Sequence, residues 1–309
     1  MASTGLYIIE NSLWQVGILP ETGASIAFGR IKRDRHSFDF LRPTPESSYR
    51  NPSNCASFAL IPWSNRLRAG HFRFQGSDYQ LQTNGSDGTA IHGVVRNFPW
   101  QVESFSATRL TARFDSRDFQ NVNFPFHFSA SIDFILDDEQ FSVVTWLKNE
   151  DKTPMPGGFG HHPYFVRSLV GDADPVQLEI PCLEFFKLEN ALPSTGPVPV
   201  EPRVDFRKMR PLGDELIDDC LTGRKPGQPI RFSYTESGAQ IALHMEPIFQ
   251  NIVLYVPQEK PFFAVEPVTN ANDGFNLFDK GIPGSGVLVL EPREDKHGVF
   301  TFQIEQPPR

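Results

Sequence analysis

Hydrophobic and polar residues alternate along several short segments, and the clearest alternation runs from Phe126 to Leu136. Every second position in this segment is apolar, and His127, Ser129, Ser131 and Asp133 stand between the apolar residues. A period of two is typical of a β-strand with one buried face. A second run, Phe141 to Lys148, follows after four polar residues. The two runs therefore predict an antiparallel hairpin.

Similar short segments recur along the chain, and no long segment between them has the 3.6-residue period of a helix. We expect further strands at Leu6–Ile9, Leu13–Leu19, Ala24–Gly29, Phe72–Phe74, Tyr79–Leu81, Trp100–Phe105, Leu110–Phe114, Val176–Ile180, Ile230–Tyr234, Gln240–Met245, Ile252–Val256, Phe262–Val265, Val287–Leu290 and Val299–Ile304. This spacing predicts an all-β fold, a large antiparallel sandwich with few short helices. Strands of the same character flank the Pro-rich stretches Leu192–Pro202 and Gly223–Pro229, so we interpret residues 1–309 as one domain.

Composition and charge narrow the class of protein. The 28 Phe favour strands, and the 27 Pro and 23 Gly favour turns. A net charge of −8 argues against a nucleic-acid partner. Residues 1–10 have neither a basic start nor an apolar core, and no apolar run is long enough to cross a membrane. We therefore expect a soluble cytoplasmic protein with no membrane partner, and the sequence carries no signal for its oligomeric state.

The three cysteines, Cys55, Cys182 and Cys220, are far apart and form no CxxC pair. They predict neither a disulfide framework nor a zinc site, which fits a reducing compartment. His161 and His162 are adjacent, so in extended backbone their side chains point to opposite faces and cannot both bind one metal. Phosphate-binding glycine loops and a GxSxG motif are missing from the sequence. We expect no metal and no cofactor.

Polar residues gather among Gly, Pro and aromatic residues in four segments, which are Ile61–Arg66, Ala90–Gly93, Gly160–Phe165 and Val265–Asn270. Each is placed at a strand end or in a loop, where binding groups can converge without disturbing a core. Taken alone, His92 is better interpreted as a buried or loop histidine hydrogen-bonded to the backbone. Arg66 could be a structural ion-pair partner or could equally donate to hydroxyl groups.

Two acidic positions are ambiguous. Glu266 follows the apolar run Phe262–Val265 and precedes Pro267, which places it at a strand end with partial burial. Partial burial raises the pKa of a carboxylate and makes it a better base near neutral pH. A solvated acid at a strand end is an equally good interpretation of Glu266 taken alone. Asp218 and Asp219 could serve a site or merely solvate a turn.

Taken in order, these segments resemble the aldose 1-epimerase (galactose mutarotase) family from Asn51 to about Phe278. The stretch Asn65–Phe74, followed by Ile91-His92-Gly93 and Pro99-Trp100, is similar to the family's N-terminal signature. Gly158–Phe165 and Phe263–Asn270 are similar to its two catalytic segments. The resemblance implies a β-supersandwich fold and a cofactor-free interconversion of the α and β anomers of a free hexose.

The resemblance also implies roles for individual residues. Glu266 matches the general base, His162 the general acid and His92 a second active-site histidine. Arg66, Asn65 and Asp218 match positions that bind sugar hydroxyls. His161 is an alternative to His162, although His162 fits the register with Pro163-Tyr164-Phe165 better.

Other functions on the same fold stay open. A hexose-6-phosphate 1-epimerase would need basic residues near C6 of the sugar, for which Arg66, Arg68 and Arg96 are candidates. A carbohydrate-binding or sensing protein would not need an acid–base pair. A lyase or glycosidase is a third interpretation, but the sequence shows no pair of carboxylates at a diagnostic spacing.

Overall fold

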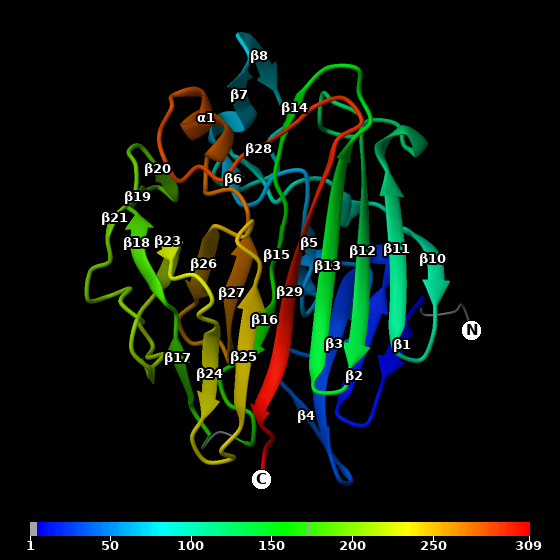
Figure 1. Cartoon of the computed structure of the whole chain (residues 1–309), viewed down its shortest axis with the longest axis vertical. Coiled ribbons are helices and arrows are strands. Elements are labelled where there is room, and N and C mark those ends of the chain that lie inside the picture. Colours follow the sequence, from blue (N-terminus) through cyan, green and yellow to red (C-terminus); the bar gives the residue numbers. More distant parts are fainter. Residues whose placement is uncertain (1–4, 172–173) are drawn as a thin grey trace.

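The computed structural model describes residues 5–171 and 174–309 (Figure 1), and strands dominate it. In this part of the chain the helical elements are the α-helix α1 (Gly274–Asp279) and short 3-10 turns at Pro20–Thr22, Glu46–Ser48, Pro52–Asn54, Arg68–Gly70, Val95–Asn97 and Ser116–Asp118. The sequence-based expectation of an all-β fold with few short helices is confirmed.

Most strands belong to two large sheets, and all pairings in both are antiparallel within the described residues. The first sheet has, in spatial order, β10 (Gln101–Phe105), β11 (Arg109–Asp115), β12 (Phe128–Asp137), β13 (Gln140–Asn149), β29 (Asp295–Gln306), β25 (Gln240–Met245), β24 (Ile230–Tyr234), β17 (Val176–Glu179) and β22 (Arg210–Pro211). The second sheet has β21 (Val198–Pro199), β18 (Cys182–Phe186), β23 (Ile217–Arg224), β26 (Asn251–Val256), β27 (Phe262–Val268), β15 (Gly160–His161) and β5 (Ala59–Leu60), and β16 (Tyr164–Val166) also pairs with β27.

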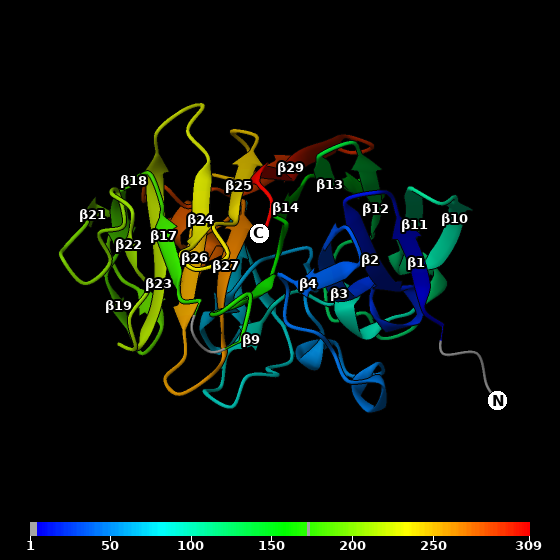
Figure 2. The ribbon, with the colours of Figure 1, turned by 90° about the horizontal axis from the view of Figure 1, so that it is seen from below.

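Smaller sheets complete the fold. One contains β1 (Tyr7–Glu10), β2 (Trp14–Leu19), β3 (Ser25–Arg33) and β4 (His36–Asp39). The paired strands are β6 (Arg66–Leu67) with β9 (Ala90–Ile91), β7 (His71–Phe74) with β8 (Ser77–Gln80), β14 (Met155–Gly157) with β28 (Leu288–Leu290), and β19 (Leu188–Glu189) with β20 (Leu192–Pro193). Figure 2 shows β24 and β25 of the first sheet lying over β26 and β27 of the second.

The hairpin predicted from the alternating segment is confirmed, because β12 and β13 pair in register from Phe128 with Asn149 to Asp137 with Gln140. Six strands of the second sheet are missing from the sequence-based prediction, and they are β5, β15, β16, β18, β21 and β23. The last of these, β23, contains both Asp218 and Asp219. Of the two alternatives for these aspartates, the solvated turn is therefore wrong. Two adjacent acids hide the apolar alternation on which the prediction depends.

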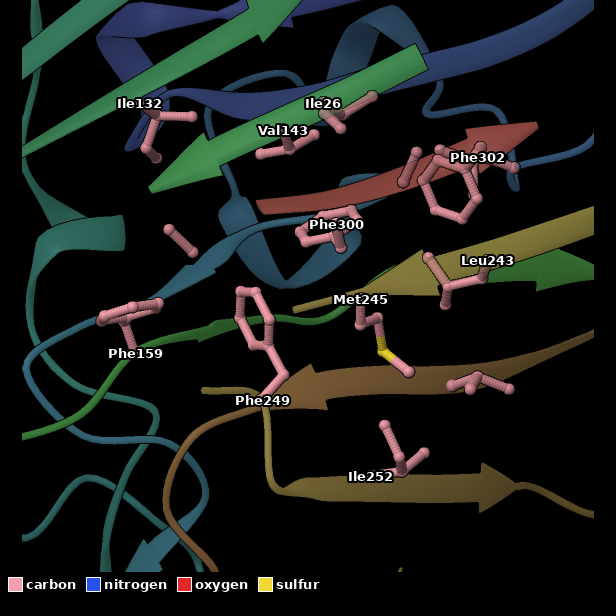
Figure 3. Close-up of a cluster of buried hydrophobic side chains, with 14 of the residues drawn as sticks. Ile26, Ile132, Val143, Phe159, Leu243, Met245, Phe249, Ile252, Phe300 and Phe302 are labelled. Carbon is pink, nitrogen blue, oxygen red and sulfur yellow. The ribbon is translucent and has the colours of Figure 1, made fainter. Parts of the chain in front are cut away.

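Aromatic and aliphatic side chains fill the space between the two sheets (Figure 3). Phe300 and Phe302 of β29 and Leu243 of β25 approach from the first sheet. Ile252 of β26 approaches from the second sheet, and Phe249 from the segment that precedes β26. All five are 2% exposed or less. Phe300 packs edge-on to Phe249, with ring centroids 5.9 Å apart. This packing fixes the inner face of the second sheet, so its other face is a rigid platform for polar side chains.

Candidate active site

Glu266 lies inside strand β27, where it pairs with Val253 of β26. The structure corrects the expectation of a partly buried strand end, since β27 continues through Pro267 to Val268 and Glu266 is only 1% exposed. The cause of the error is Pro267, because proline usually marks the end or edge of a strand. The carboxylate is thus held by the backbone of a central strand.

His162 lies between β15 and β16, which both pair with β27. Gly160 pairs with Val268 and Tyr164 with Ala264, so the same register places His162 opposite Glu266. Their side chains meet, with His162 Nε2 3.1 Å from Glu266 Oε1. The second atom of each group, His162 Nδ1 and Glu266 Oε2, is buried without a hydrogen-bond partner among the described residues.

His161 points to the opposite face of the sheet. Its Nε2 atom lies 2.7 Å from Thr145 Oγ1 of β13, and its ring packs edge-on to Phe300. The prediction that the adjacent histidines face opposite ways is confirmed. The structure therefore brings His162, and not His161, to Glu266.

His92 joins the pair from a loop after β9. Its backbone N–H donates to the Asn65 carbonyl at 2.9 Å, and its ring centroid lies 5.4 Å from that of His162. The backbone of His92 is left-handed, with φ of 66°, and a Cβ on Gly93 would lie 2.1 Å from the Ile61 carbonyl oxygen. Gly93 is therefore required for the tight approach of this loop to the segment that carries Asn65.

Arg66 and Asp218 form the more exposed side of the site. Arg66 Nη1 lies 3.9 Å from Asp218 Oδ2, and Arg66 Nε donates to Asp87 Oδ2 at 2.8 Å. Arg66 Nη1 also donates to Asn65 Oδ1 at 3.1 Å. The side chains of Arg66 and Asp218 are 19% and 33% exposed, so both can reach a ligand from solvent.

Asp219 has a different partner from Asp218. Arg203 donates to both of its carboxylate oxygens, at 2.6 and 2.8 Å. Strand alternation turns these neighbours to opposite faces, and Asp218 alone faces Arg66. The six residues that the sequence marks for the site, Glu266, His162, His92, Arg66, Asn65 and Asp218, come together in the structure.

Burial dominates the electrostatics of the site. It raises the pKa of Glu266 well above its ordinary value, and the nearby Asp218 charge raises it further. Burial lowers the pKa of His162 to about 3, assisted by the Arg96 guanidinium. Burial, and then the charge of His162, lowers the pKa of His92 well below its usual range. Both members of the Glu266–His162 pair are thus driven toward their neutral forms in the free protein.

Aromatic rings and two arginines surround His162 and were not singled out by the sequence, apart from Arg96. The ring centroids of Phe58 and Tyr164 lie 4.9 and 4.3 Å from that of His162. The Arg42 guanidinium stacks on Tyr164, and the Arg96 guanidinium lies over Phe58. Tyr164 follows His162 by two residues in an extended segment, which is the signal that places it on the same face.

The described residues contain no group of three or more His, Cys, Asp or Glu side chains arranged to hold a metal ion. All three cysteines are buried free thiols. None of the helices described by the structure is long and apolar enough to cross a membrane.

Solved structures with the same architecture define the class of fold, a galactose mutarotase-like sandwich. A putative aldose 1-epimerase from Escherichia coli K12 superposes with a TM-score of 0.83 at 22% identity, covering 97% of this chain and 98% of that one. A homologue of GalM/aldose epimerase from C. elegans gives a TM-score of 0.82 at 17% identity over 98% and 99% of the two chains.

Sequence comparison leads to the family. The aldose 1-epimerase family model matches residues 8–298, so this chain belongs to the aldose 1-epimerase family. Two uncharacterized proteins of Escherichia coli K12 are 25% identical to it: YphB over 88% of this chain and 90% of its own length, and YihR over 75% and 73%.

The contrast between the two adjacent aspartates gives a stability prediction. Asp219→Asn breaks a buried, doubly hydrogen-bonded pair and should lower the free energy of unfolding by about 1–3 kcal/mol, because Arg203 is partly solvated. Burial raises the pKa of Asp218, so its charge does not favour folding and Asp218→Asn should cost little. Urea unfolding monitored by tryptophan fluorescence measures both variants. Equal losses would contradict this division.

Proposed function

We propose that this protein is an aldose 1-epimerase that interconverts the α and β anomers of a hexose by opening and closing the sugar ring. The observation that carries the proposal is the contact of 3.1 Å between His162 Nε2 and Glu266 Oε1 on the polar face of the second sheet. Ring opening requires a base for the C1 hydroxyl proton and an acid for the ring oxygen O5. A carboxylate and an imidazole held side by side can serve both positions.

The proton balance of the reaction fits such a pair. Glu266 takes the proton from the C1 hydroxyl as His162 gives one to O5, the C1–O5 bond breaks, and the open-chain aldehyde forms. Rotation about C1–C2 exposes the other carbonyl face. Ring closure then reverses both transfers and returns each proton. The pair holds one transferable proton throughout. In the free protein burial favours this proton on Glu266, so it passes to His162 across their contact before ring opening.

The other residues bind and orient the sugar in this proposal. His92 donates a hydrogen bond to the ring oxygen as negative charge develops there. Arg66, Asn65 and Asp218 hold sugar hydroxyls, and the charged members do so through charge-assisted hydrogen bonds. The partial exposure of Arg66 and Asp218 supports this role, because solvent reaches their side of the site, whereas Asn65 is buried beside Arg66.

Glu266→Gln should remove about 10²–10⁴-fold of the mutarotation rate, because it deletes the base while keeping the shape of the side chain. The variant should stay folded, since the wild-type carboxyl is already driven toward its neutral form by burial. Polarimetry on freshly dissolved α-D-galactose and α-D-glucose measures the rate, with buffer alone as reference. Near-normal acceleration by the variant would refute the role of Glu266. Sugar binding by the wild type without acceleration would favour a binding or sensing protein.

The two histidines form a matched pair of variants. His162→Ala should lose about 10²–10⁴-fold in kcat, because the acid is removed. His161→Ala should lose stability rather than chemistry, since His161 contacts Thr145 and Phe300 on the core face. Polarimetry at a temperature where circular dichroism shows both variants folded separates the two effects. Loss of turnover in folded His161→Ala, with His162→Ala active, would contradict the assignment.

The pH dependence of kcat/KM follows from the protonation of Glu266 and His162 considered together. A doubly protonated pair lacks the base and a deprotonated pair lacks the acid, so kcat/KM should be bell-shaped. The acid limb should lie far below the ordinary imidazole value of 6.5, because burial lowers the pKa of His162 to about 3. The alkaline limb should lie well above 4.5, because burial raises the pKa of Glu266. Polarimetry corrected for buffer catalysis gives the profile, and an acid limb near 6.5 would contradict it.

A further inference from the structure

Two arginines beside the site have no acidic partner. No carboxylate in residues 5–171 and 174–309 forms an ion pair with Arg42 or Arg96, whereas Arg66 pairs with Asp87 and Arg68 with Asp273. Arg42 Nη2 donates to the Cys55 carbonyl at 2.8 Å. Arg96 Nη1 is 3.4 Å from Ser53 Oγ, and Arg96 Nε is buried without a partner in the described chain.

Both guanidinium groups stand one aromatic ring away from His162. The Arg42 Cζ atom lies 4.0 Å from the centroid of the Tyr164 ring, and the Arg96 Cζ atom lies 5.0 Å from that of Phe58. These two rings are the ones that pack on His162. The positive charges of Arg96 and Arg42 also act on His162 by lowering its pKa.

Partly buried cations of this kind are costly without a counter-charge. Both arginine side chains are only partly exposed, and burial lowers the pKa of each. Stacking on an aromatic face offsets part of the cost of removing a guanidinium from water, but it leaves most N–H donors unused. A planar fork of donors matches a carboxylate or a phosphate in geometry and charge. The guanidinium groups of Arg42 and Arg96 would therefore be neutralised by a carboxylate or phosphate of a bound ligand.

The order of strands fixes the side of the site on which these cations lie. Asp218 is on β23, two strands from Glu266 on β27, whereas Phe58 precedes β5 on the far side of β15 (Figure 1). The backbone N–H of His162 donates to the Phe58 carbonyl, and that of Arg42 to the Tyr164 carbonyl. Arg42 and Arg96 therefore flank His162, and Asp218 lies beyond Glu266.

We propose that Arg42 and Arg96 form a subsite for an anionic group on C6 of the sugar, so that the preferred substrate is a hexuronate or a hexose 6-phosphate. This inference rests on the proposed function, in which His162 protonates the ring oxygen O5. O5 is bonded to C5, which carries C6, so the C6 substituent extends toward the side of His162. Arg68, a candidate on sequence alone, pairs with Asp273 and its side chain is half exposed, so it is not part of the subsite.

The test compares sugars that differ at C6. The kcat/KM for anomer exchange is measured by NMR exchange spectroscopy with D-galactose, D-galacturonate, D-glucose, D-glucuronate and D-glucose 6-phosphate. At least one acidic sugar should exceed its neutral parent by about 10-fold or more, since a hydrogen bond to a charged group contributes about 1.5–3 kcal/mol. The uronate and phosphate arms identify which anion the subsite takes. Equal or lower kcat/KM for every acidic sugar would overturn the proposal.

Single substitutions identify the residues that cause the preference for acidic sugars. Arg96→Gln and Arg42→Gln should each lower the ratio of acidic-sugar to neutral-sugar kcat/KM by about 10–100-fold. Arg35→Gln removes the same charge from an exposed turn between β3 and β4 and should leave the ratio unchanged. An unchanged ratio in folded Arg96→Gln would overturn the proposal. If Arg42→Gln fails to fold, Arg96→Gln and the wild-type comparison still decide it.

Failure of this inference and failure of the proposed function are distinguishable. If the wild type accelerates the neutral and acidic sugars equally, the enzyme is a mutarotase without an anion subsite. If it accelerates none of the five sugars, the proposed function itself fails. Inorganic phosphate provides an independent readout, because it should inhibit exchange of D-galactose competitively in the wild type and less in Arg96→Gln.

Discussion

The site depends on one constraint, the burial of a carboxylate on a central strand with a single imidazole as its neighbour. An isolated carboxylate in such a place would be neutralised or expelled, because transfer of a charge from water is very costly. Glu266 stays in place because β27 is paired on both sides, with β26 on one and β15 and β16 on the other. The core that anchors these strands therefore also fixes the distance between Glu266 and His162, which lies in the two-residue connection between β15 and β16.

Because side chains alternate between the two faces of a sheet, adjacent residues in this protein have different roles. His162 faces Glu266, whereas His161 faces Thr145 and the core. In the same way Asp218 faces Arg66, whereas Asp219 is held by Arg203. Each doublet thus contributes one side chain to the polar site and one to the scaffold. A slip of one residue in either strand would exchange the two roles, so register is as important to the chemistry as residue identity.

The sequence predicts the fold well because periodicity and turn residues act locally. The hairpin of β12 and β13 has clean alternation and a polar turn, and both are visible without a structure. Glu266 and β23 are two places where prediction from local sequence patterns fails. Pro267 suggests a strand end, and two adjacent aspartates hide a strand, because tertiary pairing overrides these local signals. The pairing of Asp219 with Arg203, and the absence of an ion pair at Arg42 among the described residues, depend on segments far apart in the sequence, so no local pattern contains them.

Charged side chains are distributed unevenly along the site. Acidic Asp218 and Asp87 lie with Arg66 at one end, and at the other end Arg42 and Arg96 form no ion pair with any acid that the structure describes. Between them the Glu266–His162 pair is buried and driven toward neutrality, so the electrostatic field along the site is set by the charged residues at its two ends rather than by this pair. Anomer exchange alters the sugar only at C1 and O5, and the chemistry requires no particular group at C6. In the proposed reaction, substrate specificity can therefore depend on Arg42 and Arg96 while the Glu266–His162 pair stays the same, so the chemistry and the choice of sugar are set by different residues.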